Sequence, residues 1–202
     1  MNILWYFKYS IFLWHLSTSI FSIFHNFFYI TALQKAATNN EIEVIYSLLL
    51  NEKEIPNCLF LKNENLKQIS IPSSVTSIGY YAFRVCYSLM QVSIPSSITS
   101  IGCSAFYECL SLTEMTIPSS VTSIGYSAFR RCLSLTQISI PSSVTLIDDY
   151  TFFECSSLTQ ISIPSSVNSI GIYAFYRCSS LTQITFIIPS SVTSIGNYAF
   201  CE

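Results

Sequence analysis

The stretch SLTQISIPSSVNSIGIYAFYRC, residues 157–178, is one copy of a motif that recurs with small changes from Leu66 to the end of the chain. Its proline marks the period, because neighbouring copies lie 23 residues apart and only the last step is 25 residues: Pro72, Pro95, Pro118, Pro141, Pro164 and Pro189. A repeat of this length cannot bury its apolar side alone and is typical of a solenoid, in which each copy forms one coil. The sequence therefore predicts stacked 23-residue coils.

Each coil contains a segment that predicts a short strand. In LTQISIP, residues 158–164, we expect Leu158, Ile161 and Ile163 to point inward and the polar residues to face solvent. Stacked copies then form a parallel sheet with a flat, polar and nearly uncharged outer face. Proline ends the strand because it has no amide hydrogen to donate, and a second β-branched stretch of the VTSI type returns to the core.

Two features of the sequence that follow this second stretch indicate the turn of each coil. The first is a glycine that we expect to need positive φ, with Asp148 as a tolerated substitute: Gly79, Gly102, Gly125, Gly171 and Gly196. The second is a pair of one small and one large apolar residue, with phenylalanine at Phe83, Phe106, Phe129, Phe152, Phe175 and Phe200. Rings repeated at the coil period predict a buried ladder that supplies much of the stability.

The order LxxIxIP, IG, AF and C resembles the BspA-like leucine-rich repeat family of bacterial and protozoan surface proteins. The resemblance covers residues 55–202, with an altered first coil starting near Ile55 and a truncated last coil. It implies a leucine-rich repeat solenoid that is mainly β, with stacked 23-residue coils and a parallel sheet, preceded here by N-terminal helices. For several members it implies display on the cell surface and binding to host or matrix proteins, and it carries no catalytic residue over to this chain.

Five of the eight cysteines occupy one position of successive coils: Cys86, Cys109, Cys132, Cys155 and Cys178. We expect them to stack as a ladder of small buried hydrophobic side chains about 5 Å apart, the spacing of strands. Side chains stacked in parallel would form a disulfide only with strained geometry. The coils contain neither a CxxC pair nor a histidine, so no metal site is predicted.

One residue before this ladder, the charges alternate along the coils. The position reads Val85 and then a predicted structural charge ladder of Glu108, Arg131, Glu154, Arg177 and Glu202. Each glutamate would then lie between arginines, and a slip of one coil would bring like charges together. The alternative interpretation is a solvated edge in which each exposed pair contributes about 0.2–1 kcal/mol.

Two surfaces are candidates for binding a partner. The first is the outer face of the strands, with Gln91, Glu114, Gln137, Gln160 and Gln183. The second is the set of turns that carry Tyr80, Tyr81, Tyr107, Tyr126, Tyr150, Tyr173 and Tyr176. Partly exposed tyrosines on a rigid scaffold favour protein contacts, because they supply area at little entropic cost. The alternative is that they only cover the turns.

Composition argues against enzymatic and nucleic-acid functions. The only histidines, His15 and His25, lie outside the repeats, which also lack a phosphate-binding glycine-rich loop, so we predict no enzyme and no cofactor. The formal net charge is −2 and only 10% of residues are charged, without a basic cluster, so we predict no nucleic-acid partner.

Two segments precede the repeats. Residues 1–30 form an apolar segment, and the uncharged stretch 11–30 is long enough to span a bilayer as an anchor. A signal peptide, a buried helix and a mispredicted extension are the alternatives. Residues 31–55 resemble the helix pair of an ankyrin repeat, with Ala36, Ala37, Leu48 and Leu49 at matching positions. One such unit cannot bury its own apolar face, so we expect residues 31–54 to cap the first coil.

Two classes of function remain open from the sequence. The first is a non-enzymatic surface antigen or adhesin-like module at the cell surface or membrane, which binds a host or matrix protein or a glycan. The second is a cytoplasmic scaffold in which the ankyrin-like helices and the solenoid together bind a protein. A third interpretation is that the chain is a fragment of a longer repeat protein, since the last coil stops without a cap and offers an edge for self-association.

Overall fold

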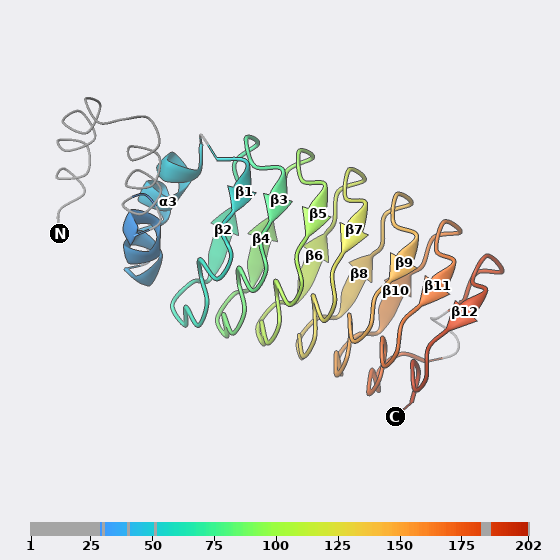
Figure 1. The fold of residues 1–202 in the computed structure, drawn as a ribbon. Coiled ribbons are helices and arrows are strands. Elements are labelled where there is room, and N and C mark those ends of the chain that lie inside the picture. Colours follow the sequence, from blue (N-terminus) through green and yellow to red (C-terminus); the bar gives the residue numbers. More distant parts are fainter. Residues whose placement is uncertain (1–28, 30, 40, 51, 183–186, 202) are drawn as a thin grey trace, which may run out of the picture.

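The computed structural model describes residues 29, 31–39, 41–50, 52–182 and 187–201, and it consists of helices followed by a row of coils (Figure 1). Residues 31–38 are helical, and helix α3 covers Ile42–Leu49. The coils carry one set of three-residue strands: β2 (Gln68–Ser70), β4 (Gln91–Ser93), β6 (Glu114–Thr116), β8 (Gln137–Ser139) and β10 (Gln160–Ser162). They also carry a set of two-residue strands: β1 (Glu54–Ile55), β3 (Ser77–Ile78), β5 (Ser100–Ile101), β7 (Ser123–Ile124), β9 (Leu146–Ile147), β11 (Ser169–Ile170) and β12 (Ser194–Ile195).

Each strand pairs in parallel with the same strand of a neighbouring coil. The longer strands form the groups β2-β4 and β6-β8-β10, and the shorter ones form β1-β3-β5-β7 and β9-β11-β12. Partners are one repeat apart, as in Gln137 with Gln160, and the pairing of Ser169 with Ser194 absorbs the longer last step. The predicted solenoid of stacked coils with parallel strands is confirmed.

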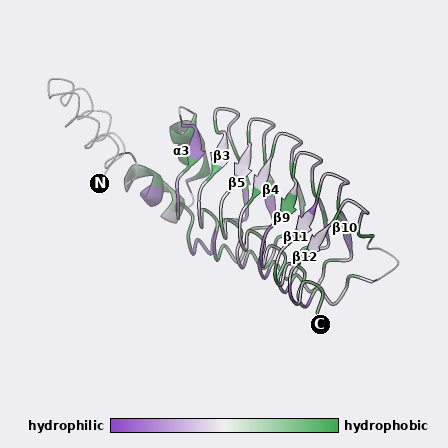
Figure 2. Cartoon of the chain, turned by 45° about the vertical axis from the view of Figure 1, so that its right-hand side comes forward, coloured by the Kyte–Doolittle hydropathy of each residue, from purple (hydrophilic) through white to green (hydrophobic). Residues whose placement is uncertain are grey.

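Hydrophilic and hydrophobic residues are interspersed along the coils (Figure 2). In every three-residue strand the middle side chain is buried and its two neighbours are exposed. Leu158 and Ile161 point into the core as predicted, whereas Ile163 is only partly buried. The short strands β3, β5, β7, β9 and β11 likewise bury their isoleucine.

The predicted phenylalanine ladder runs through the described coils. Rings of successive coils from Phe60 to Phe200 are stacked with centroids 4.9–5.5 Å apart and planes within 2–10° of parallel. Phe60, Phe83, Phe106, Phe129 and Phe152 are among the largest fully buried side chains. Burial of an aromatic side chain stabilises a fold by about 1.5–3 kcal/mol, so this ladder is a major part of the core.

The prediction for the repeat glycines is wrong, because none of the chain's glycines adopts positive φ. They lie instead against the main chain of the preceding coil. A Cβ atom on Gly102 would lie 2.7 Å from the carbonyl carbon of Gly79, and one on Gly125 would lie 2.7 Å from the amide nitrogen of Cys103. Glycine is needed here for the close approach of coils, and Asp148 in the same position also lacks positive φ.

Positive φ occurs instead at two other positions of each turn, the second and sixth residues after the glycine. The φ values lie between 52° and 64°, and the residues are Cys58, Lys62, Tyr81, Val85, Ser104, Glu108, Ser127, Arg131, Tyr150, Glu154, Tyr173, Arg177 and Tyr198. This conformation turns their amides toward the next coil, so that Tyr81 N donates to Cys103 O at 3.0 Å and Val85 N to Tyr107 O at 2.7 Å. Hydrogen bonds between coils therefore offset the strain of the left-handed backbone.

The N-terminal helices lie against the first coil. Leu33, Ile45 and Leu49 are buried in the same core cluster as Ile55 and Phe60. The side-chain amide of Asn63 donates to the Ala37 carbonyl, and Ser74 Oγ donates to Leu49 O at 3.1 Å. The ankyrin resemblance and the domain boundaries remain predictions from the sequence.

The predicted membrane segment, residues 11–30, lies almost entirely outside the described residues. Within the part of the chain that the structure describes, no helix has the length and apolar character needed to cross a bilayer.

Candidate functional site

The outer face of the three-residue strands is polar and exposed. It presents Gln91, Glu114, Gln137 and Gln160, and Gln137 Nε2 donates to Glu114 Oε2 at 3.2 Å across neighbouring coils. Glu114, Gln137 and Gln160 line a shallow groove of about 290 Å³ over β6, β8 and β10. Gln183 lies outside the described residues.

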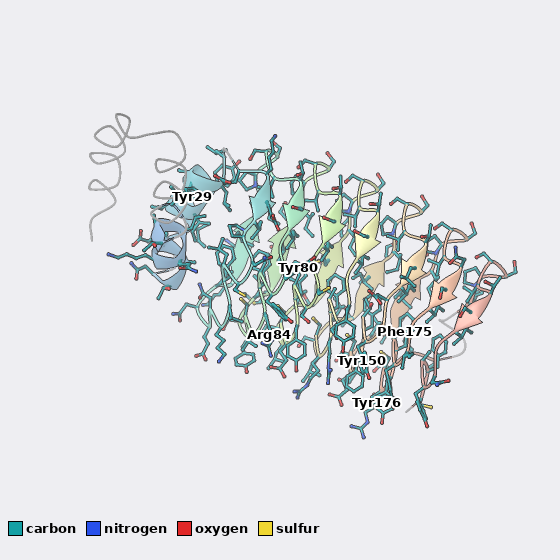
Figure 3. All side chains as sticks on the ribbon, viewed as in Figure 1. Tyr29, Tyr80, Arg84, Tyr150, Phe175 and Tyr176 are labelled. Carbon is teal, nitrogen blue, oxygen red and sulfur yellow. The ribbon has the colours of Figure 1, made fainter. Side chains whose placement is uncertain are left out.

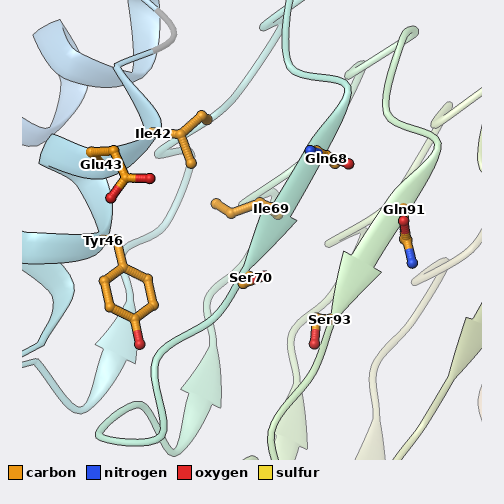
Figure 4. Close-up of a pocket in the computed structure, with 8 residues that line it drawn as sticks. All are labelled: Ile42, Glu43, Tyr46, Gln68, Ile69, Ser70, Gln91 and Ser93. Carbon is orange, nitrogen blue, oxygen red and sulfur yellow. The ribbon is translucent and has the colours of Figure 1, made fainter.

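A second groove lies where this face meets helix α3 (Figure 4). Its volume is about 610 Å³, and Ile42 and Tyr46 of α3 face Ser70, Gln91 and Ser93 of β2 and β4 across it. Each groove is lined by a row of amide side chains and a row of hydroxyl side chains. Few of the lining side chains are large enough to act as anchors for a partner. The strand face can therefore offer hydrogen bonds, but little apolar area.

The turns of the coils build a different surface along the lower side of the solenoid, where Figure 3 places Arg84, Tyr150 and Tyr176. We call this surface the Arg–Tyr edge. It consists of Tyr81, Arg84, Tyr107, Tyr126, Arg130, Tyr150, Phe153, Tyr173, Tyr176, Arg177 and Tyr198.

Tyrosines of the Arg–Tyr edge stack on one another from coil to coil. The rings of Tyr150 and Tyr173, and those of Tyr173 and Tyr198, have centroids 5.1 Å apart. Tyr126 lies 5.4 Å from Tyr150 in a tilted arrangement. The structure thus brings these tyrosines together, and Tyr150, Tyr173 and Tyr198 share the same position of the coil and a positive φ.

Arginines pack against other rings of this edge. The guanidinium carbon of Arg84 lies 4.9 Å from the centroid of Tyr107, and that of Arg130 lies 5.6 Å from the same ring. Arg130 also lies 4.4 Å from Phe153, and Arg177 lies 5.2 Å from Tyr176. Each contact is a cation–π interaction, in which the ring face attracts the cation.

Sequence reasoning missed Arg84, Arg130 and Phe153 as parts of this surface. The signal was present one residue after the ladder phenylalanine, where successive coils read Arg84, Tyr107, Arg130, Phe153 and Tyr176. Each tyrosine alone carries no such signal, and only comparison of the same position across coils reveals that cation and ring alternate from Arg84 to Phe153.

Exposure differs widely among the predicted tyrosines. Tyr80 and Tyr126 are 55% and 42% exposed, whereas Tyr107 is half-buried between two arginines. Tyr81 is also exposed, and Tyr198 is the most exposed tyrosine of the described residues at 58%. The surface therefore combines fixed rings with rings that are free to meet a partner.

The residues of the predicted charge ladder lie within ion-pair distance of one another. Arg131 Nη1 contacts Glu108 Oε1 at 2.5 Å, and Arg131 Nε lies 3.3 Å from Glu154 Oε2 without hydrogen-bond geometry. Arg177 Nη1 contacts Glu154 Oε1 at 3.2 Å. Glu202 lies outside the described residues.

The five ladder cysteines are buried, and each donates its Sγ–H to a phenylalanine carbonyl of the preceding coil at 3.0–3.2 Å. Burial raises the pKa of the Cys86 and Cys178 thiols to about 12, and it also raises the pKa of the Cys109, Cys132 and Cys155 thiols well above the ordinary value of a cysteine. All described cysteines are free thiols. No group of metal-ligating side chains occurs among the described residues.

The chain matches the model of a known protein family. The sequence model of the BspA type leucine-rich repeat region matches residues 53–182 in six copies. No curated protein matches the chain.

Comparison with solved structures finds bacterial leucine-rich repeat proteins. A leucine-rich cell surface protein of Faecalibacterium prausnitzii is 39% identical with a TM-score of 0.67, and the match covers 73% of this chain and 40% of that one. A leucine-rich repeat protein of T. pallidum is 26% identical with a TM-score of 0.53, covering 65% of this chain and 72% of that one. The pneumococcal vaccine antigen PcpA is 25% identical with a TM-score of 0.50, covering 71% and 34%. The chain thus spans less than half the length of the first and third of these proteins.

Proposed function

We propose that this chain, which belongs to the BspA-type leucine-rich repeat family, is a protein-binding module displayed on a cell surface. Its family and its structural neighbours are non-enzymatic repeat proteins, and this general class is consistent with a binding role. Display is supported by the neighbour from F. prausnitzii, which is described as a cell surface protein, and by PcpA, which is described as a vaccine antigen.

The Arg–Tyr edge is the observation that carries the binding role. Tyrosine and arginine are the residues most enriched at the energetic centres of protein interfaces. Here they are held by stacking and by hydrogen bonds between coils, so little side-chain entropy is lost when a partner binds. The exposed rings of Tyr126 and Tyr198 supply contact area along the same edge as the half-buried Tyr107.

The strand face is the weaker candidate for protein contacts. Its exposed side chains are amides, hydroxyls and one carboxylate, and the apolar residues of the same strands point inward. Such a face would bind through hydrogen bonds alone, each of which contributes only about 0.5–1.5 kcal/mol net.

Site-specific photocrosslinking on living cells tests the binding surface. A photoreactive phenylalanine analogue is placed at Tyr126 on the Arg–Tyr edge and, as a matched control, at Gln137 on the strand face. We expect a discrete protein adduct from position 126 and none from position 137. An adduct only from position 137 would move the interface to the strand face, and no protein adduct from either position would contradict protein binding.

Antibody staining tests the display. The producing cells are stained intact and after permeabilisation, and we expect equal signal in the two conditions. Signal that emerges only after permeabilisation would reject surface display and favour the cytoplasmic scaffold.

A further inference from the structure

The Arg–Tyr edge and the adjacent charge ladder carry more positive charge than their own carboxylates neutralise. All four arginines of the chain lie here, in two adjacent positions of the repeat: Arg84, Arg130, Arg131 and Arg177. Glu108 and Glu154 are the described carboxylates that pair with them, and both contact Arg131 or Arg177. Arg84 and Arg130 form no ion pair with any described residue.

These two guanidinium groups are fixed by rings rather than by acids. Arg84 lies over Tyr81 at 5.5 Å and over Tyr107 at 4.9 Å, and Arg130 lies over Phe153 at 4.4 Å. A ring covers the flat face of a guanidinium and leaves the N–H groups at its rim available to an acceptor. The Nε atom of Arg130 is buried and has no hydrogen-bond partner among the described residues, so its donor capacity is unused.

An anion is the ligand that meets these unused donors. Guanidinium groups bind carboxylates through paired, charge-assisted hydrogen bonds, which are about twice as strong as neutral ones.

The spacing and the charge density favour a peptide. Arg84 and Arg130 occupy the same position two coils apart, which places them roughly 10 Å apart by the spacing of strands. An extended polyproline II segment presents every third residue on one side at a repeat of about 9 Å. Sulfated polysaccharides are bound by runs of five or more basic residues, and this edge has no such run.

We infer that Arg84 and Arg130 bind the carboxylates of an acidic, extended segment in the protein partner. This inference rests on the proposed function and adds the chemistry of the partner to it. Tyr81, Tyr107 and Phe153 would contact the apolar residues between the acids.

Fluorescence anisotropy with a labelled peptide tests the inference on the full chain. The probe is a peptide of Glu-Pro-Pro repeats, and a peptide of Gln-Pro-Pro repeats of equal length is the uncharged control. We expect the glutamate peptide to bind and the R84Q/R130Q double variant to bind it at least about tenfold more weakly, from the loss of two charge-assisted contacts. Raising the salt concentration should weaken the wild type more than the double variant.

Lys53→Gln is the matched variant, because it removes one positive charge at an exposed position away from the edge. We expect it to bind the peptide within twofold of the wild type, and circular dichroism checks that all variants fold. Equal binding of the glutamine peptide, or equal weakening by Lys53→Gln, would overturn the inference. Tighter binding of a sulfated heparin fragment that displaces the peptide would overturn it in favour of a glycan.

Crosslinking on cells and peptide binding together distinguish a wrong partner chemistry from a wrong binding surface. An adduct at position 126 on cells, together with no binding of the glutamate peptide, would leave the edge as a protein interface and reject the acidic partner. Absence of both would reject the interface itself.

Discussion

At the scale of single residues, the ladder cysteines do more than fill space. Each thiol donates to the carbonyl of a phenylalanine in the coil before it, so the ladder ties neighbouring coils while remaining small enough for the core. Burial in turn keeps the thiols protonated, because a thiolate would lose its hydration without gaining a cation.

This burial predicts a loss of stability in alkali. A cysteine in the unfolded chain ionises near pH 9.0, whereas Cys86 and Cys178 keep their protons to about pH 12. The folded pKa is raised, so the contribution is complete below pH 9.0 and declines as the pH rises toward 12. Each ladder thiol should remove about 1.4 kcal/mol of unfolding free energy per pH unit in that range.

Urea unfolding followed by circular dichroism at several pH values above 9 measures this slope. The Cys132→Ala variant is the control, since it has one ladder thiol fewer and should show a shallower slope, whatever its stability at neutral pH. Identical slopes for the two proteins would show that the ladder thiols ionise in the folded state.

Two neighbouring positions of one turn should respond to substitution with opposite signs. Gly125→Ala places a Cβ against the main chain of the preceding coil and should lower the unfolding free energy by roughly 1–3 kcal/mol. Ser127→Gly should raise it by about 1 kcal/mol, because Ser127 has φ of 54° and a buried hydroxyl without a partner. Urea denaturation gives both values, and a loss at both positions would contradict this account of the turn.

At the scale of the coil, the turn is a chain of alternating hydrogen bonds. The amides of Tyr81, Phe83 and Val85 donate to the next coil, and those of Ala82 and Arg84 donate back within the same turn. Successive amides of the turn thus alternate between a hydrogen bond to the next coil and a hydrogen bond within their own coil. Within this turn the ring of Phe83 is buried, Arg84 is half-buried and Tyr81 is exposed.

This pattern explains which features of the coil were predictable. Leu158, Ile161 and the ladder phenylalanines follow from hydrophobic periodicity within one repeat. The role of Gly102 and the left-handed backbone of Tyr81 do not, because both result from contact with another coil. The position of Arg84 between rings has the same origin, since its partner Tyr107 belongs to the following repeat.

The phenylalanine ladder should dominate the stability of a coil. Phe129→Ala removes a fully buried ring that is stacked on both sides and should cost about 3–5 kcal/mol of unfolding free energy. Phe153→Ala is the matched control, because Phe153 is half-buried and contacts Arg130 and Tyr176 at the surface, so its loss should cost about 1 kcal/mol. Chemical denaturation compares the two, and equal costs would contradict the dominant role of the ladder.

At the scale of the whole molecule, the stack is uniform in its core but not along its charged edge. The core positions repeat in every coil, whereas the sign of the charge at Glu108, Arg131 and Glu154 repeats only in every second coil. A solenoid that is built from interchangeable coils thereby acquires a preferred order of coils.

Removal of one complete coil tests this order. Deletion of residues 113–135 keeps the register of strands and core, so the shortened protein should fold, but it sets Glu108 beside Glu154. Addition of Glu108→Arg restores the alternation and should raise the unfolding free energy by roughly 1 kcal/mol at low salt. Denaturation of both shortened proteins at low and high salt measures the gain, and no gain at low salt would show that the order of charges is irrelevant to stability.

The alternating charge edge also bears on how such a gene can change. Nearly identical coding repeats invite unequal recombination, which inserts or removes whole copies. Loss of the copy that carries Arg131 would leave two glutamates in contact, while loss of that copy together with the next one would preserve the pairing of Glu108 with an arginine. Natural length variants of this protein should therefore differ by even numbers of repeats. In that case the ion pairs at the surface would limit which chain lengths persist in evolution.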